Sequence, residues 1–237
     1  LNTSDPDENQ LAFNYALVNG SGSAGNSQFL VRNDSLFTNA VFNFEVLSSY
    51  SIRLRSTDPG NASVQQSFVI TVLDGSDAPT DIILSNSSVS ENQSGGTTIG
   101  TLSSVDQDQT NFFTYSLVSG AGSTDNSQFS ISGSTLRTNA VFDAELKSQY
   151  SIRVRTNDGY NGVFEKVFLI NILDMNDAPT NISLTANAVK ENVTSNTLIG
   201  FLSASDQDAG QQFTFSFDAV SGNNNSNFVI SGNQLRT

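Results

Sequence analysis

The sequence lacks cysteine, histidine and tryptophan altogether, and its 237 residues include only four prolines. Without Cys and His, the chain can form no disulfide, thiol nucleophile, Ser-His-Asp triad or common zinc or copper site. Basic residues are scarce, because Lys and Arg number 10 against 23 Asp and Glu, a net charge of −13. Such an acidic surface argues against nucleic acid and anionic membranes as partners, and it favours cations.

Long apolar runs are missing as well. None approaches the roughly 18 residues of a membrane helix, so we expect no membrane insertion in this segment, and no leader peptide is recognised at its start. Charged residues make up only 14% of the chain, whereas Ser, Asn, Thr and Gly are abundant and 17 Phe stand in for the missing Trp. A weakly charged polar surface with Phe and β-branched residues for a core predicts an all-β protein, secreted to the extracellular space or cell surface.

The sequence repeats itself with a period of 100 residues. So many matches in one register do not arise by chance, and they indicate a tandem array. We therefore predict a partial repeat at 1–77 without its N-terminal strands, a complete repeat at 78–177, and a partial repeat at 178–237 without its C-terminal strands. The matching pairs include Asp-Ala-Pro-Thr at 77–80 and 177–180, Asn-Ala-Val-Phe at 39–42 and 139–142, and Tyr-Ser-Ile-Arg at 50–53 and 150–153.

The complete repeat alternates apolar and polar residues with a period of two. At 150–155, for example, Tyr, Ile and Val alternate with Ser and Arg, which places one face of a strand in the core and the other in water. No stretch keeps a helical period. About seven short strands per repeat predict tandem Greek-key β-sandwiches of immunoglobulin-like size. The predicted strands lie at 82–84 with a break before 89, and at 98–102, 112–118, 128–132, 135–138, 150–154 and 164–173.

The recurring acidic residues fall at predicted strand ends and in the connector between repeats. Calcium takes six to eight oxygen ligands from carboxylates, Asn side chains and backbone carbonyls, whereas Mg²⁺ prefers a tighter octahedron. The connector Asp-Met-Asn-Asp at 174–177 supplies three side-chain oxygen ligands within four residues. Asp and Asn can also simply cap turns and keep a surface soluble, but that role needs no recurrence. The pattern therefore predicts Ca²⁺ sites.

Taken together, these motifs resemble the cadherin repeat over the whole chain. They match, in order, that family's early strand Glu, its Asp-x-Glu and Asp-x-Gly motifs, its Asp-x-Asn-Asp-x-Ala-Pro linker and its Asp-x-Asp motif. The Ser- and Asn-rich setting is most similar to cadherin-like repeats of very large bacterial surface proteins, and the similarity to animal adhesion receptors is looser. The matching residues are Glu91, Phe-Asp-Ala-Glu at 142–145, Thr-Asn-Asp-Gly at 156–159, Asp-Met-Asn-Asp-Ala-Pro at 174–179 and Asp-Gln-Asp at 206–208.

The resemblance implies two groups of metal ligands, which we name the first and second junctions. At the second junction it implies carboxylates together with the Asn176 side chain and the backbone carbonyls of Met175 and Ala178. The first junction departs from the pattern, since Asn43 replaces an Asp, and we expect weaker or fewer ions there. The carboxylates of the second junction are Glu91, Asp143, Glu145, Asp174, Asp177, Asp206 and Asp208. Those of the first are Glu45, Asp74, Asp77, Asp106, Asp108 and Asp158.

The function that follows is mechanical: a Ca²⁺-stiffened stalk, arranged as an elongated rod, within a large extracellular surface or filament protein. Paired carboxylates can hydrolyse glycosides, but these pairs recur once per repeat, so we predict no enzyme. A carbohydrate-binding module and a homophilic adhesion module stay open as alternatives. The first needs an exposed aromatic platform, for which only Tyr160 is a loop candidate. The expected partners are calcium ions, like repeats of neighbouring chains and surface glycans.

Overall fold

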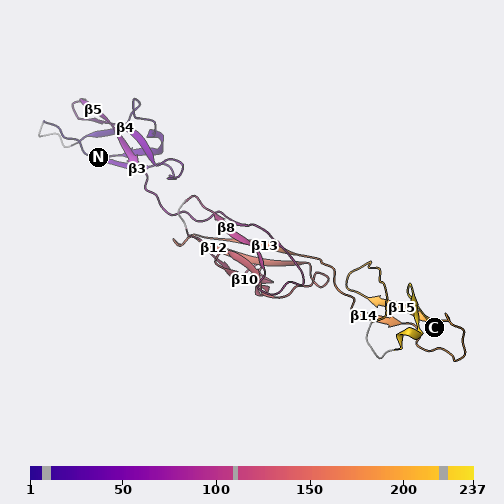
Figure 1. Ribbon diagram of the computed structural model, residues 1–237. Helices are drawn as coiled ribbons and strands as arrows, with labels where there is room; N and C mark the ends of the chain where they lie inside the picture. Colours follow the sequence, from indigo (N-terminus) through magenta and orange to yellow (C-terminus); the bar gives the residue numbers. More distant parts are fainter. Residues whose placement is uncertain (7–11, 109–111, 219–223) are drawn as a thin grey trace. The chain divides into compact units, whose positions relative to one another are not determined.

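The computed structural model describes residues 1–6, 12–108, 112–218 and 224–237 (Figure 1). The described residues form strands and three short 3-10 helices, with no α-helix, and none of these helices has the length or apolar character to cross a membrane. The predicted all-β class is confirmed. The chain divides into two compact units. One comprises Leu1–Ile82, Ser104–Thr114 and Thr156–Phe164, and the other Ile83–Ser103, Tyr115–Arg155 and Glu165–Thr237.

The middle of the chain forms a sandwich of two four-stranded sheets. One sheet has the order β10-β11-β8-β6, and the other has the order β7-β13-β12-β9. β7 runs parallel to β13, with Val89 opposite Ile172, so the break after β6 passes the chain from one sheet to the other. The strands are β6 (Asp81–Leu84), β7 (Ser88–Ser90), β8 (Thr98–Val105), β9 (Thr114–Leu117), β10 (Phe129–Ser132), β11 (Thr135–Thr138), β12 (Gln149–Asn157) and β13 (Val163–Leu173).

The core of this sandwich comes from the predicted alternation. Ile152, Ile170 and Leu136 are completely buried. Each such side chain contributes about 1.5–3 kcal/mol relative to an exposed position. One expectation was wrong: the strand predicted from residue 112 begins only at Thr114, and Phe112 is 90% exposed. The local Phe-Phe-Thr-Tyr pattern could not reveal that only the second half of this run pairs with a neighbouring strand.

The two ends of the chain repeat parts of this sandwich. Towards the N-terminus, one sheet has the order β1-β4-β5, and β2 and β3 form a hairpin. Towards the C-terminus, a sheet has the order β14-β15-β17-β16. The strands are β1 (Asn14–Leu17), β2 (Phe29–Arg32), β3 (Ser35–Thr38), β4 (Ser49–Thr57), β5 (Ser63–Thr71), β14 (Asn181–Leu184), β15 (Leu198–Ser205), β16 (Val229–Ser231) and β17 (Gln234–Arg236). The 3-10 helices are η1 (Asn26–Gln28), η2 (Asn126–Gln128) and η3 (Asn225–Asn227).

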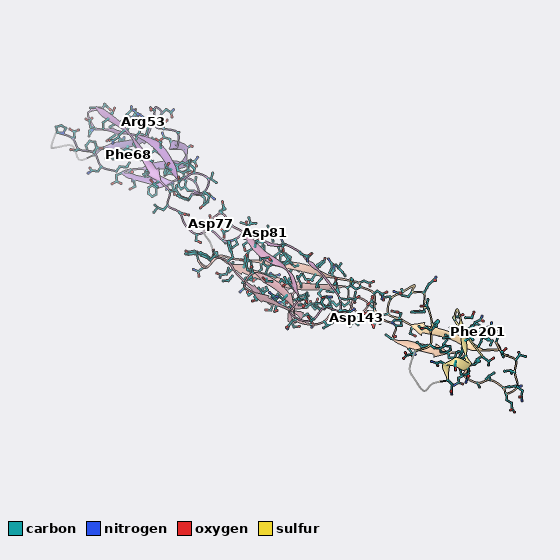
Figure 2. All side chains as sticks on the ribbon, viewed as in Figure 1. Arg53, Phe68, Asp77, Asp81, Asp143 and Phe201 are labelled. Carbon is teal, nitrogen blue, oxygen red and sulfur yellow. The ribbon has the colours of Figure 1, made fainter. Side chains whose placement is uncertain are left out.

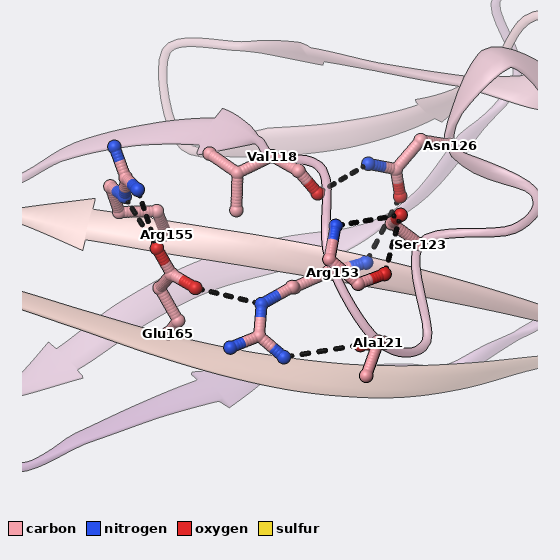
Figure 3. A network of polar contacts seen from close by, with 8 residues as sticks. Val118, Ala121, Ser123, Asn126, Arg153, Arg155 and Glu165 are labelled. Atoms are coloured by element: carbon pink, nitrogen blue, oxygen red, sulfur yellow. Dashed lines mark hydrogen bonds and ion pairs between the residues drawn. The ribbon is translucent and has the colours of Figure 1, made fainter.

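A polar network on β12 fixes the loop that follows β9 (Figure 3). Arg153 donates from Nε to Glu165 at 2.7 Å, and Arg155 donates to the other oxygen of the same carboxylate at 2.8 Å. These two hydrogen bonds lower the pKa of Glu165 below its ordinary value. Asn126 accepts from the Arg153 backbone N–H and donates to the Val118 carbonyl at 2.9 Å. The network is explained by loop anchoring, and its hydrogen bonds involve none of the carboxylates of the recurring acidic motifs.

Candidate metal centres

An aromatic cluster anchors the turn that carries two carboxylates of the second junction. Phe142 is only 3% exposed, and its ring lies 5.4 Å from that of Phe129 and 4.6 Å from that of Tyr150, between centroids. Immediately after Phe142, Asp143 accepts a hydrogen bond from the Leu146 backbone N–H at 2.8 Å. This bond closes the turn, so the packed core holds Asp143 in place on the adjoining surface (Figure 2).

Glu91 is the one carboxylate of the second junction that is completely buried, with 0% exposure. Its Oε1 accepts the backbone N–H of Met175 at 2.7 Å, and its Oε2 accepts that of Ala144 at 2.6 Å. Its own N–H donates to the Leu173 carbonyl at 3.0 Å. Because a buried charge is tolerated only when it is hydrogen-bonded, these bonds hold the end of β7, the 142–145 turn and the connector after β13 together.

The carboxylates of the second junction gather into two clusters that share Glu145. In one, oxygens of Glu91, Glu145 and Asp177 lie within 4.8 Å of one another, and in the other so do oxygens of Glu145, Asp174 and Asp208. A backbone hydrogen bond lowers the pKa of Glu145, but desolvation and repulsion from Glu91, Asp174 and Asp208 raise it overall above its ordinary value of 4.5. Mutual repulsion of this kind is what a cation would relieve.

Hydrogen bonds order the acidic side chains around these clusters. The Asp177 backbone N–H donates to Asp208 at 2.6 Å, and the Asp208 N–H donates to Asp206 at 3.1 Å. Asn92 donates from Nδ2 to Asp177 at 2.7 Å and has a left-handed φ of 60°. The connector therefore binds both to the 206–208 loop and to the residue after Glu91.

The remaining predicted ligands lie in the same connector. Asn176 accepts a hydrogen bond on Oδ1 from Gln211 at 2.7 Å and donates from Nδ2 to the Asp177 carbonyl at 2.7 Å. The oxygen that we expected to bind a metal thus has a protein donor, which a metal ion would have to displace. Met175 and Ala178 are exposed residues, as expected of positions where only the backbone carbonyl matters.

At the first junction the carboxylates form one cluster of three residues, whereas those of the second junction form two such clusters. Oxygens of Glu45, Asp74 and Asp108 lie within 4.8 Å of one another. A backbone hydrogen bond lowers the pKa of Glu45, but desolvation and the charges of Asp77, Asp74 and Asp108 raise it overall. As at the second junction, the Asp77 N–H donates to Asp108, at 2.8 Å, and the Asp108 N–H donates to Asp106, at 2.9 Å. Asp77 lies in the stretch between β5 and β6 (Figure 2).

The first junction also contains two buried carboxylate oxygens without a hydrogen-bond partner, Oδ2 of Asp106 and Oδ2 of Asp158. Asp158 is 1% exposed, and its Oδ1 accepts the backbone N–H groups of Tyr160 and Gly162 at 2.7 and 3.0 Å. Asp106 lies two residues after Ser104 of β8, and Asp158 lies two residues after Thr156 of β12. The hydroxyls of Ser104 and Thr156 hydrogen-bond to each other at 2.7 Å. Unpaired buried carboxylate oxygens are costly, so these two atoms fit a cation well.

Two kinds of functional residue escaped the sequence reasoning, namely Asn92 and the glutamines Gln107 and Gln207 between the paired aspartates. Asn92 donates to Asp177, Gln107 to Asp77, and Gln207 to Asp143, with the latter two bonds at 3.4 and 3.2 Å. Both residue types recur in the sequence, Asn after the early Glu and Gln inside Asp-Gln-Asp. That recurrence was the available signal, but these amides lie outside the ligand positions that the resemblance implies.

Comparison with known proteins shows what this chain is similar to. No protein-family model matches the chain. Human Cadherin-12 is 29% identical over 235 residues, covering 89% of this chain, and human Protocadherin gamma-B2 is 27% identical over 189 residues, covering 75%. The Protocadherin GammaB4 extracellular domain is 25% identical with a TM-score of 0.56 over 94% of this chain and 37% of that one. In sequence and in fold, the chain is similar to cadherin repeats.

Mouse Cadherin-23 EC22-24 shares the fold at 22% identity, with a TM-score of 0.59 over 95% of this chain and 75% of that one. The likeness to cadherins and to their extracellular domains supports the predictions of an extracellular, adhesion-type segment without enzymatic activity. The chain spans only 20% of Protocadherin gamma-B2 and 29% of Cadherin-12. The closer likeness to bacterial surface proteins stays a prediction.

Proposed function

We propose that this segment is a calcium-stiffened stalk of a large extracellular surface protein, with cadherin repeats at 1–77, 78–177 and 178–237. The observation that carries the proposal is the gathering of carboxylates into clusters whose oxygens lie within 4.8 Å of one another. The ion pairs of the described residues join Lys147 to Asp125 and two arginines to Glu165. They leave the clustered Glu145 without a basic partner, and a bound cation would supply the balancing charge.

The ligands at the second junction would be its seven carboxylates, with backbone carbonyls of Met175 and Ala178 and, once Gln211 is displaced, the Asn176 side chain. Calcium suits them because they are all hard oxygen donors in number sufficient for six- to eight-fold coordination. At the first junction the unpaired oxygens of Asp106 and Asp158 would be ligands beside the Glu45 cluster. The neutral Asn43 in place of a carboxylate lowers the ligand charge there, which supports weaker binding.

The mechanical role follows from what the carboxylates do with and without a cation. Without it, like charges repel and favour arrangements in which the connector and the 206–208 loop separate. Calcium bound to both neutralises the repulsion and favours the docked arrangement, because the ion binds that arrangement more tightly. Extracellular sites of this type have Kd values of about 10⁻⁴–10⁻³ M, so extracellular calcium would keep them filled.

Homophilic adhesion is the second candidate. It is supported by the likeness to the Protocadherin gammaB7 EC3-6 cis-dimer structure, at 25% identity and a TM-score of 0.52. The bacterial origin, the filament and the surface-glycan partner are finer interpretations that rest on the sequence alone. Tyr160 is 67% exposed, but one aromatic ring makes no platform, so glycan binding has the weakest support. Sedimentation at increasing protein concentration separates a self-associating adhesin from a monomeric stalk segment.

A calorimetric Ca²⁺ titration of the Gly162→Ala variant tests the metal sites. A Cβ at this position would lie 2.0 Å from the unpaired Oδ2 of Asp158 and 2.8 Å from the Ala78 Cα, so the carboxylate or the connector must move. We expect a loss of affinity on the order of tenfold for the ion held by Asp158, in a chain that still folds, since Ala62 occupies the matching position one period earlier.

The matched control is Gly95→Ala, because a Cβ there would meet nothing closer than 3.7 Å. Its isotherm should equal that of the unmodified chain. Identical isotherms for all three proteins would contradict the assignment of Asp158, and an absence of calcium binding in the unmodified chain would contradict the proposed function itself.

A further inference from the structure

The glutamines inside the two Asp-Gln-Asp motifs bind across the junctions directly. At the second junction, Gln207 donates from Nε2 to Oδ2 of Asp143 at 3.2 Å. At the first junction, Gln107 accepts on Oε1 from Nδ2 of Asn43 at 3.1 Å. In both places an amide from the later loop meets the same turn of the preceding segment, 64 residues earlier in the chain.

The residue at the start of that turn decides how the glutamine is oriented. Asp143 and Asn43 each use Oδ1 to accept a backbone N–H, from Leu146 at 2.8 Å and from Val46 at 2.9 Å. The remaining atom is therefore an acceptor oxygen in Asp143 but a donor nitrogen in Asn43. A glutamine amide satisfies either one by presenting nitrogen or oxygen, which neither a carboxylate nor a lysine can do.

At the first junction the reversed amide makes a second bond. With Oε1 turned to Asn43, Nε2 of Gln107 donates to Oδ2 of Asp77 in the connector, at 3.4 Å. At the second junction the matching connector carboxylate, Asp177, instead accepts from Asn92. Gln107 thus links the turn, the connector and its own loop through one amide–amide and one amide–carboxylate hydrogen bond, at the junction where a carboxylate of the metal motif is missing.

We infer that Gln107 is a metal-independent bridge that keeps the first junction partly docked at calcium concentrations too low to hold the second. This inference rests on the proposed function, because it assumes that calcium stabilises docking at both junctions. Asn43, which stands where the motif has an Asp, removes one negative charge and one metal ligand from the first junction. Gln107 supplies hydrogen bonds there in their place. The two junctions differ in the cause of their stiffness, so a fall in calcium releases the second junction first.

Distances between paired spin labels test the bridge in the whole chain, which has no native cysteine. Matched pairs one period apart are Val41→Cys with Val105→Cys, and Val141→Cys with Ser205→Cys, all at exposed positions. In EDTA we expect the 141–205 distance distribution to broaden more than the 41–105 distribution. Adding Gln107→Ala should raise the undocked fraction seen by the 41–105 pair about threefold to tenfold in EDTA, and millimolar Ca²⁺ should reverse much of this.

The control is Gln149→Ala, an exposed glutamine on β12 that bonds to Asn171 and should change neither distribution. An unchanged 41–105 distribution in Gln107→Ala in EDTA would overturn the bridge, and so would an equal broadening of both pairs in the unmodified chain. If calcium narrows neither pair and calorimetry detects no binding, the proposed function fails. The comparison of Gln107→Ala with the unmodified chain in EDTA still decides the bridge on its own.

Discussion

The Glu91→Gln variant is expected to lose calcium affinity at the second junction by on the order of tenfold or more, and to be less stable even without calcium. The side chain keeps its shape, but the cluster with Glu145 and Asp177 loses a charge and an anionic ligand. In addition, a glutamine has one acceptor oxygen where Glu91 uses two, for Met175 and Ala144. One backbone N–H then faces an NH₂ group in a buried site, which costs about 1–3 kcal/mol.

A calcium titration measures the loss of calcium affinity, and chemical denaturation in EDTA measures the loss of stability. The matched control is Glu191→Gln, which carries the same change one period later, at an exposed position. We expect this control to keep both the stability and the calcium affinity of the unmodified chain. If Glu91→Gln binds calcium as tightly as Glu191→Gln, then Glu91 anchors the connector but holds no ion.

Removal of calcium should have the largest effect on the stability of the chain. With Kd values of about 10⁻⁴–10⁻³ M, each ion contributes about 1.4–2.7 kcal/mol at 10 mM Ca²⁺ relative to EDTA. Two ions at the second junction would together contribute about 3–5 kcal/mol. A change of 1 kcal/mol shifts the melting temperature of a domain of about 100 residues by roughly 4 °C or more. We therefore expect the melting temperature to be higher in 10 mM Ca²⁺ than in EDTA by on the order of 10 °C or more.

Two controls separate ion binding from simple screening of charge. Sodium chloride at matched ionic strength screens exposed carboxylates without coordinating them, so it should give only a small part of the rise. Mg²⁺ should also give less, because it keeps its water ligands and demands a tighter octahedron. A rise that sodium chloride reproduces in full would show that repulsion matters at the junctions but coordination does not.

The period of 100 and the two-residue alternation were enough to predict the sheets, since burial of one strand face leaves a direct trace in the sequence. Ile152 and Ile170 are buried as that alternation requires. The start of β9 was misplaced at Phe112, because a strand end depends on which neighbour pairs with it, and no local pattern records that. The resemblance of the motifs to the cadherin repeat implied that Glu91, Glu145 and Asp177 share a junction, and they do cluster, although they lie up to 86 positions apart.

Hydrogen bonds between neutral side chains were beyond prediction from this sequence. Nothing in the composition shows that Gln211 bonds to Asn176, or that Gln107 reverses its amide to meet Asn43. Such contacts depend on rotamers and loop positions fixed by tertiary packing, and amides occur too widely to indicate a site. The two unpaired oxygens of Asp106 and Asp158 likewise became evident only once their burial was known.

Small-angle scattering of the chain in EDTA and then at increasing Ca²⁺ tests the stiffening of the junctions most directly. If calcium docks the junctions, the maximum dimension should increase and the profile should change from that of a flexible chain of domains to that of a stiffer particle at about millimolar Ca²⁺. Superimposable profiles with and without calcium would contradict a calcium-stiffened stalk. The acidic clusters would then be solvated surface charge, with no part in holding the repeats together.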